Sequence, residues 1–147
     1  MIALGADHGG LNLKEAIKKY LDSEKIEYKD FGTFDEASVD YAPIAAQVAH
    51  FVVDGKAEKG ILCCGTGIGM SIAANKVDGI RAAVCSDAYC AEITRHHNNS
   101  NILCLGGRVI NEQQAVEFSK LFLNTEFDGG RHQRRVDEIT AIERGEL

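Results

Sequence analysis

The stretch that most constrains the fold of this chain runs from Gly60 to Ser71 and reads Gly-Ile-Leu-Cys-Cys-Gly-Thr-Gly-Ile-Gly-Met-Ser. It opens with an apolar run that ends at Cys64, and three glycines at alternate positions follow at once. The segment 71–76 then begins a predicted helix. Proteins of the α/β class build anion sites and active sites where a buried strand leads through a glycine-rich turn into a helix. The stretch therefore predicts an α/β fold with Cys64 at the edge of a ligand site.

Similar apolar runs alternate with helical patterns along the rest of the chain. Apolar residues recur at helical spacing over 13–21, with lysine and glutamate between them. Pro43, the only proline, fits the first turn of a helix, and Asn111 fits an N-cap. The predicted strands are 1–6, 26–31, 60–64, 81–86 and 101–105, and the predicted helices are 13–21, 43–54, 71–76, 88–97, 111–124 and a final stretch with Val136, Ile139 and Ile142.

The strands are continuous apolar runs, which is typical of a parallel sheet with helices on both faces. We predict one domain over residues 1–147: a doubly wound, five-stranded parallel sheet of Rossmann-like or flavodoxin-like type, with strand order 2-1-3-4-5. In such sheets ligands bind where the strand order reverses, at the carboxyl ends of the strands. That position lies between strands one and three, so Asp7 and His8 are expected close to Cys64.

Composition excludes several classes of protein. The net charge of −6 argues against a large basic surface for nucleic acid. No apolar run reaches the roughly eighteen residues of a membrane span, and the N-terminus lacks the basic start of a signal peptide. Five cysteines, an odd number, fit free thiols in a reducing cytoplasm better than a disulfide framework. A cytoplasmic protein that binds neither membrane nor nucleic acid is expected.

The glycine turn is open to three interpretations. Gly65-Thr66-Gly67-Ile68-Gly69 departs from the dinucleotide pattern GxGxxG, and it follows the third strand instead of the first. It fits an anion cradle, a tight turn that packs a helix on a strand, or a dinucleotide site with Asp87 as the acidic partner. Backbone N–H groups can approach a ligand closely at glycines, because no Cβ obstructs them.

Strand alternation sends Cys63 and Cys64 to opposite faces, so one thiol can be in the core while the other meets the crevice. A thiol at a helix N-terminus near cations favours the thiolate, which acts as a nucleophile or a general base. The alternative is a cysteine that serves as a small apolar core residue. We interpret Cys85, Cys90 and Cys104 as core residues of that kind.

Histidines and arginines in the second half of the chain form further candidates. His96 and His97 fall in a last helical turn, where histidine is often only a charge match for the helix terminus. No CxxC or HExxH spacing supports a metal site. Arg131 and Arg135, four residues apart, share a face of any helix, and with Arg108 they fit a phosphate clamp. A solvated charged tail is the alternative.

Taken together and in this order, the motifs resemble those of the B-type ribose-5-phosphate isomerases, in the group that includes allose-6-phosphate isomerase and galactose-6-phosphate isomerase subunits. The matching segments span nearly the whole chain: Asp7-His8, Asp40-Tyr41, Cys64 to Gly69, Arg95 to Asn98, Gly106 to Val109, and Gly129 to His132 with Arg135. Some relatives carry glutamate as the base, and Cys64 places this chain with the cysteine branch.

The resemblance implies that ribose 5-phosphate and ribulose 5-phosphate interconvert through a cis-enediol, without metal or cofactor. Cys64 would move the proton between the first two carbons, and His97 would open the sugar ring with help from Asp7 and Thr66. The backbone of Gly65, Thr66, Gly67, Ile68 and Gly69 would stabilise the enediolate. The phosphate would lie on His8, Arg131 and Arg135, and the site would be completed by Tyr41, Asn98 and Arg108. Family members are homodimers, some paired into tetramers, with the site between two chains.

Two other functions stay open from the sequence. Allose 6-phosphate is the alternative substrate within the same chemistry, because pocket depth cannot be deduced from these motifs. A non-catalytic flavodoxin-like module that binds nucleotide or flavin is the alternative from a different class.

Overall fold

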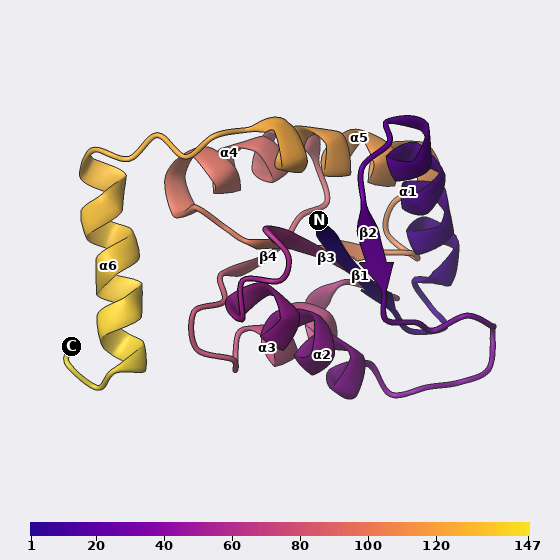
Figure 1. Cartoon of the computed structure of the whole chain (residues 1–147), viewed down its shortest axis with the longest axis horizontal. Coiled ribbons are helices and arrows are strands. Elements are labelled where there is room, and N and C mark those ends of the chain that lie inside the picture. The colour runs from indigo at the N-terminus through magenta and orange to yellow at the C-terminus, as the bar shows by residue number, and fades with distance from the viewer.

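The computed structural model describes residues 1–147 and shows a single parallel sheet between two layers of helices (Figure 1). Five strands and six helices alternate along the chain. In chain order they are β1 (Ile2–Ala6), α1 (Leu11–Ser23), β2 (Tyr28–Asp30), α2 (Tyr41–Val53), β3 (Lys59–Cys64), α3 (Ile68–Ala74), β4 (Ala82–Val84), α4 (Ala88–Asn98), β5 (Ile102–Gly106), α5 (Glu112–Asn124) and α6 (Arg131–Glu143). All predicted elements are present, with α3 beginning three residues earlier than expected. No helix has the length and apolar character needed to cross a membrane.

The strand order is β2-β1-β3-β5-β4, and every neighbouring pair is parallel. The α/β prediction is therefore confirmed, but the predicted order 2-1-3-4-5 is wrong at its end. β5 lies beside β3, whereas β4 is the edge strand. Burial explains the exchange, because every residue of β5 is buried while the three residues of β4 are half-buried or exposed. Burial of an apolar strand contributes more free energy when the strand lies between two neighbours than when it lies at an edge of the sheet.

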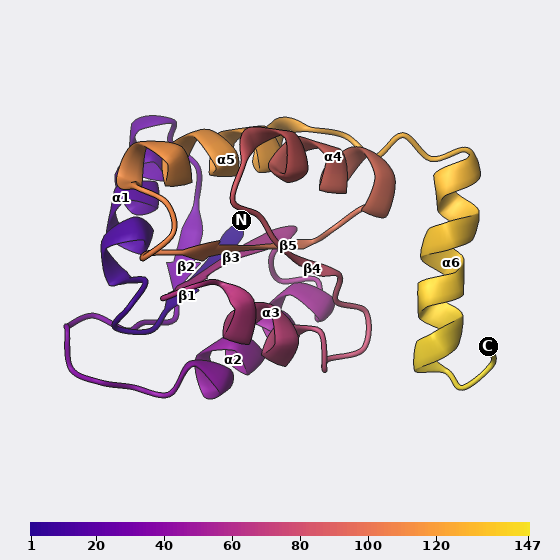
Figure 2. The same ribbon diagram turned by 180° about the vertical axis from the view of Figure 1, so that it is seen from behind.

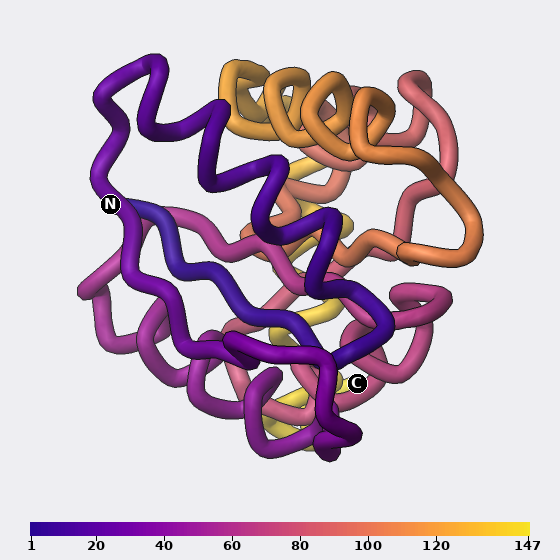
Figure 3. Tube along the Cα trace, turned by 90° about the vertical axis from the view of Figure 1, so that its right-hand side faces the viewer, coloured from indigo at the N-terminus to yellow at the C-terminus, as the bar shows by residue number.

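The two faces of the sheet carry separate apolar cores (Figures 1 and 3). One core packs α1, α4 and α5 against the sheet and includes Ile17, Cys63 and Phe122. The other packs α2 and α3 and includes Val48, Cys64 and Met70. The predicted opposite orientation of Cys63 and Cys64 is confirmed. β3 carries both thiols, so it belongs to both cores at once.

Helix α6 lies apart from this three-layer body (Figures 1 and 2). It packs against α4, and only His132 and Val136 among its residues are buried. Near its far end, the Glu143 carboxylate accepts a hydrogen bond from the Gly79 N–H at 3.0 Å. A cavity of about 440 Å³ lies between the helix and the body, with Ile139 and Ile142 on its α6 side. The helix thus leaves an apolar stripe without a cover in the single chain.

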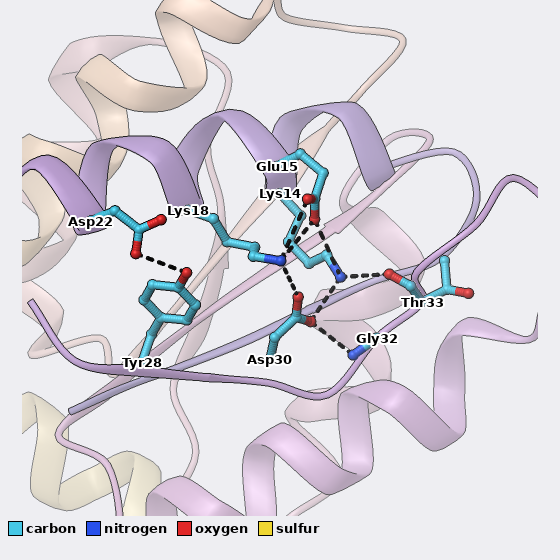
Figure 4. A network of polar contacts seen from close by, with 8 residues as sticks. All are labelled: Lys14, Glu15, Lys18, Asp22, Tyr28, Asp30, Gly32 and Thr33. Atoms are coloured by element: carbon cyan, nitrogen blue, oxygen red, sulfur yellow. Dashed lines mark hydrogen bonds and ion pairs between the residues drawn. The ribbon is translucent and has the colours of Figure 1, made fainter.

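A buried lysine ties α1 to β2 and to the loop 32–40 (Figure 4). The side chain of Lys14 is only 1% exposed, and its Nζ donates to Asp30 Oδ1 at 2.7 Å and to the Thr33 carbonyl oxygen. Lys18 adds a second ion pair, with its Nζ 2.9 Å from Asp30 Oδ2. The network fixes the start of the loop that leads to Tyr41 at the beginning of α2.

Candidate active site

The candidate site lies at the carboxyl ends of three adjacent strands. Register pairs Ala6 with Cys63, and it pairs Cys64 with Gly106, so the residues that follow β1, β3 and β5 meet at one edge. An open cavity of about 430 Å³ lies there. It is lined by Asp7, Tyr41, Cys64, Gly65, Thr66, Ile68, Gly69, Ile72 and Arg108. Eight of these nine residues were expected in the site, and the fold brings them together from four segments of the chain.

Ile72 is the lining residue that the sequence motifs do not indicate. It lies one helical turn after Ile68, and both side chains are exposed on α3. Helical spacing places residues i and i+4 on one face. The predicted helix begins only at Ser71 and so excludes Ile68. The sequence therefore does not indicate that Ile68 and Ile72 lie on one helix face.

Close packing requires glycine at two positions of the turn. Gly67, the N-cap of α3, has a φ of +82°, a left-handed conformation that disfavours a side chain. A Cβ there would lie 2.9 Å from Val84 Cγ2, and a Cβ on Gly69 would lie 2.5 Å from Cε1 of the Tyr41 ring. The turn therefore allows Tyr41 to pack directly against the first turn of α3.

Cys64 is distinguished from its neighbour by its environment. The Gly67 N–H donates a hydrogen bond to Cys64 Sγ at 3.1 Å. The Ile68 N–H donates to Thr66 Oγ1 at 3.2 Å. Burial, followed by the proximity of Cys64, raises the pKa of the Cys63 thiol well above its ordinary value. Only Cys64 combines a place in the cavity wall with a donor aimed at its sulfur.

The end of β1 holds a carboxylate in a fixed orientation. Asp7 Oδ1 accepts hydrogen bonds from the N–H groups of Gly9 at 2.9 Å and Gly10 at 3.2 Å. The next residue, His8, is exposed, and its Nδ1 accepts from the Val39 N–H at 3.3 Å. In a neutral His8 ring the proton is therefore on Nε2. This bond connects the strand end to the loop that the Lys14 network fixes.

Arg108 follows β5 and closes the cavity from that side. Its backbone N–H donates to the Gly65 carbonyl oxygen at 2.9 Å. A Cβ placed on Gly65 would lie 3.1 Å from Nη1 of the guanidinium, so the Arg108 side chain lies over the glycine turn. A cation in this position supplies the local positive charge that an acidic protein needs for an anionic ligand.

The remaining predicted residues lie elsewhere in the single chain. His97 and Asn98 end α4, and Arg131 and Arg135 lie on the first turns of α6. None of these four lines the Cys64 cavity, and Asn98 lines the cavity between α6 and the body instead. One chain thus carries the candidate residues as two separate groups.

The end of α4 and the beginning of α6 are joined by paired histidines. His96 Nδ1 lies 2.7 Å from Asp128 Oδ1 and its Nε2 lies 3.6 Å from Glu92 Oε1. The hydrogen bond to Asp128 is the main cause that raises the pKa of His96. The His97 ring stacks on the His132 ring, with centroids 4.2 Å apart and planes 13° from parallel. His96 is therefore an ion-pair partner that joins the two segments, whereas His97 contacts the second segment through the face of its ring.

The same region brings together side chains that can ligate metals. Potential ligand atoms of His97, Asp128 and His132 all lie within 4.8 Å of one another. The nitrogen lone pairs of two stacked rings lie in two nearly parallel planes, whereas a tetrahedral metal needs donors that converge on one point. Asp128 is also already paired with His96. The arrangement does not fit a metal ion unless a ring turns.

The predicted core role of one cysteine is wrong. Cys90 is exposed on the first turn of α4, where the Asp87 side chain caps the helix by accepting from the Cys90 N–H. Its position next to an N-cap turns it away from the sheet. Cys85 and Cys104 are buried as expected, and burial raises the pKa of Cys85 to about 12.

Comparisons with known proteins agree on one family. The sequence model of the family described as Ribose/Galactose Isomerase matches residues 2–139. Ribose-5-phosphate isomerase B of Escherichia coli is 47% identical over 97% of this chain and 95% of its own. The structure of Clostridium thermocellum ribose-5-phosphate isomerase B has a TM-score of 0.96 at 48% identity, covering 99% of both chains. The Mycoplasma genitalium enzyme, crystallised with bound ribulose 5-phosphate, has a TM-score of 0.93 at 39% identity, covering 97% of this chain and 95% of its own.

Proposed function

The chain belongs to the ribose/galactose isomerase family and is an isomerase, and from this premise we propose that it interconverts ribose 5-phosphate and ribulose 5-phosphate. The observation that carries the proposal is the thiol of Cys64 in the wall of the strand-end cavity, with the Gly67 N–H directed at its sulfur. The similarity to a protein crystallised with ribulose 5-phosphate supports a five-carbon sugar phosphate as the ligand.

Cys64 acts as the base in the proposed mechanism. The thiolate takes the proton from C2 of the open-chain aldose, and the electron pair of that bond moves to form the enediolate. The same sulfur then returns the proton to C1, while the hydroxyl proton of O2 passes to O1, which gives the ketose. Negative charge develops on the sugar oxygens, where donors fixed in advance stabilise it best. We assign such donors to the backbone of the turn from Gly65 to Gly69 and to the Thr66 hydroxyl, and the support is that the turn lies beside the cavity.

Ring opening comes before this step when ribose 5-phosphate is the substrate. We assign protonation of the ring oxygen to His97, with Asp7 and Thr66 in assisting roles. His8, Arg131 and Arg135 bind the phosphate, and Tyr41, Asn98 and Arg108 complete the site. Because the phosphate is remote from the reacting carbons, its binding free energy can orient the sugar over the thiol.

The proposed enzyme is a homodimer with its site at the subunit interface. The support is the separation of the two residue groups in one chain, since a second copy can bring α4 and α6 to the Cys64 cavity. Large apolar side chains are exposed near that cavity and along the adjoining sheet edge: Ile68, Ile72, Val84, Tyr89 and Val109. Exposed apolar surface of this kind marks contact sites between proteins. Pairing of dimers into tetramers stays open.

We also place the protein in the cytoplasm and in pentose phosphate metabolism. Five cysteines without disulfide partners support a reducing compartment. The assigned substrates, an aldose and a ketose of five carbons, support a role in sugar phosphate interconversion.

The decisive experiment compares the wild-type protein with Cys64→Ala and Cys63→Ala. With ribose 5-phosphate, Cys64→Ala should lose at least about 100-fold in kcat, because general base catalysis contributes about 10²- to 10⁴-fold. It should still bind the sugar phosphate by calorimetry. Cys63→Ala, the matched control, should keep its activity. Activity lost in Cys63→Ala and kept in Cys64→Ala would contradict the assignment.

A parallel assay with allose 6-phosphate, each sugar with and without a chelator, separates the remaining alternatives. Faster turnover of allose 6-phosphate would replace the proposed substrate within the same chemistry. Loss of activity with chelator would contradict a metal-free mechanism. A purified protein that carries flavin absorbance and converts neither sugar would favour the non-catalytic alternative.

A further inference from the structure

The stacked pair of His97 and His132 is unusual because His97 is held without any hydrogen bond to its ring. The ring nitrogens of His96 lie 2.7 and 3.6 Å from the carboxylates of Asp128 and Glu92. No hydrogen bond or ion pair holds the His97 ring, and the Asp128 carboxylate, within 4.8 Å of one of its nitrogens, is paired with His96 instead. The orientation of the His97 ring is fixed instead by the face of the His132 ring, 4.2 Å away and within 13° of parallel. Stacking holds the plane of an imidazole while it leaves both nitrogens free.

The backbone around His132 gives that ring a firm support. His132 is the second residue of α6 and is 8% exposed. Its N–H donates to the Gly129 carbonyl oxygen at 3.0 Å, within a turn where Gly129 and Gly130 both have positive φ. The Asp128 N–H donates to the His96 carbonyl oxygen at 3.1 Å, which joins this turn to the end of α4. The stack therefore lies between two anchored segments, the end of α4 and the beginning of α6.

We propose that His132 is the positioning residue for His97: its ring fixes the plane of the His97 imidazole, so that a free ring nitrogen is directed at the sugar in ring opening. The proposal rests on the proposed function, in which His97 is the ring-opening acid. His132 itself does not touch the reacting atoms. The family resemblance implies no role for His132, although this residue lies within one of the matching segments.

The charge around His132 supports different roles for the two rings. Two imidazolium ions do not stack favourably, so at most one ring of the pair carries the proton. Burial, His97, Arg131 and Arg135 all lower the pKa of His132, and Asp128 alone among the charged neighbours opposes them. The lowered pKa of His132 thus favours the uncharged form of the ring that faces His97.

Sugar chemistry separates ring opening from proton transfer. Ribose 5-phosphate is mostly a closed furanose and must be opened. Ribulose 5-phosphate has no free hydroxyl at C5, so it forms no furanose ring and enters the reaction as an open chain. A defect confined to ring opening therefore slows the reaction from ribose 5-phosphate and leaves the initial rate from ribulose 5-phosphate nearly unchanged.

The test measures both directions for His132→Ala, for His132→Phe, which restores an aromatic ring, and for Gln133→Ala, a control on the exposed side of α6. With ribose 5-phosphate, kcat of His132→Ala should fall about 10- to 100-fold, the order expected for a misplaced catalytic group. With ribulose 5-phosphate its rate should change less than about threefold, by the same reasoning. His132→Phe should recover most of the loss, and Gln133→Ala should match the wild type.

Each other result overturns the proposal. Equal losses of kcat in the two directions would show a general structural role, and an equal rise of KM in both would show a phosphate ligand. Failure of His132→Phe to recover would show that the imidazole acts through its nitrogens instead of its face. A wild-type protein that converts neither sugar would contradict the proposed function itself, which is a distinguishable outcome.

Discussion

At the scale of single residues, the adjacent histidines His96 and His97 have different surroundings: His96 faces two carboxylates, whereas His97 stacks on His132. Hydrogen bonding to Asp128 raises the pKa of His96, whereas burial and three nearby cationic or titrating groups lower the pKa of His132. A raised pKa means that the folded protein binds the proton more tightly than the unfolded chain does. His96 therefore stabilises the fold below pH 6.5, and this contribution is lost as the pH rises through its folded-state pKa.

The titration of these side chains gives a direct prediction. By NMR, the midpoint of His96 should lie above 6.5 and that of His132 below 6.5. Asp128→Asn removes the carboxylate that faces His96, so the midpoint of His96 should move down toward 6.5. His50, on α2, serves as the internal control and should not move. An unchanged His96 midpoint in Asp128→Asn would contradict the ion pair.

The sequence is enough to predict which of two adjacent cysteines faces the crevice, but it does not distinguish neighbouring residues at every position. Alternation along a strand separates Cys63 from Cys64 by itself, since period two is a property of any strand. The choice between His96 and His97 depends on Asp128, which lies 32 residues further along the chain. The exposure of Cys90 likewise depends on how α4 meets the sheet. Contacts of this kind are set by tertiary packing.

At the scale of elements, α5 shows how local sequence sets a helix boundary. The Asn111 side chain accepts from the Gln114 N–H at 2.8 Å, and the Gln114 side chain accepts from the Asn111 N–H at 2.9 Å. This reciprocal capping box satisfies two backbone donors at the helix start. The N-cap can be predicted from sequence, because it depends only on residues three apart.

Removal of this cap should have a measurable cost. Asn111→Ala should lower the free energy of unfolding by about 1 kcal/mol, the usual value for the loss of an N-cap side chain. Urea denaturation followed by circular dichroism measures it, and Asn111→Ser, which keeps a capping oxygen, should lose much less. If Asn111→Ser lowered the free energy of unfolding as much as Asn111→Ala does, the capping oxygen would not be the source of that stability.

The network at the α1–β2 junction predicts a response to acid (Figure 4). Burial alone would raise the pKa of Asp30, but hydrogen bonds from Lys14, the Gly32 N–H and Lys18 lower it below its ordinary value of 3.8. The ionised carboxylate therefore stabilises the fold above pH 3.8, and this contribution is lost as the pH falls through the folded-state pKa.

Lys14→Met tests that network. The change keeps an apolar side chain of similar length but leaves Asp30 without its most buried partner. The free energy of unfolding at pH 7 should therefore fall by about 3 kcal/mol. The loss should shrink as the pH falls, because a protonated Asp30 needs no cation. Lys18→Met, which removes the more exposed pair, should cost under about 1 kcal/mol. Equal losses of unfolding free energy in Lys14→Met and Lys18→Met would contradict the larger contribution expected from the more buried ion pair.

The order of the strands in the sheet cannot be predicted from the sequences of the individual elements. Lengths, apolar runs and turn residues establish five strands and their parallel direction, but they do not determine which strand is inserted beside β3. The difference between β4 and β5 lies in burial, and residues 81–86 are predicted as a strand, whereas only the three residues of β4 pair. The pairing of β1 with β3 does not depend on that exchange, so Asp7 and Cys64 lie close together as predicted. The position of Arg108 in the cavity wall does depend on it, because Arg108 follows β5, which pairs with β3.

At the scale of the whole molecule, the two groups of candidate residues give a test of a shared site. If each site combines Cys64 of one chain with His97 of the other, Cys64→Ala and His97→Ala should complement each other. After equal mixing and subunit exchange, mixed dimers contain one intact site, so about a quarter of the wild-type activity should return. Each variant alone, exchanged with itself, is the control. An inactive mixture, with exchange verified by mass spectrometry of labelled chains, would place both residues in the same chain.

The attachment of α6 leads to one more consequence. Its thirteen residues rest on the body through the histidine turn at one end and Glu143 at the other, while Ile139 and Ile142 stay exposed. A helix of that length is only marginally stable without packing partners. If a second subunit supplies those partners, then the catalyst exists only while subunits remain associated. Its specific activity should therefore fall when the protein is diluted below the dissociation constant of the dimer. The rate per subunit would then depend on the protein concentration.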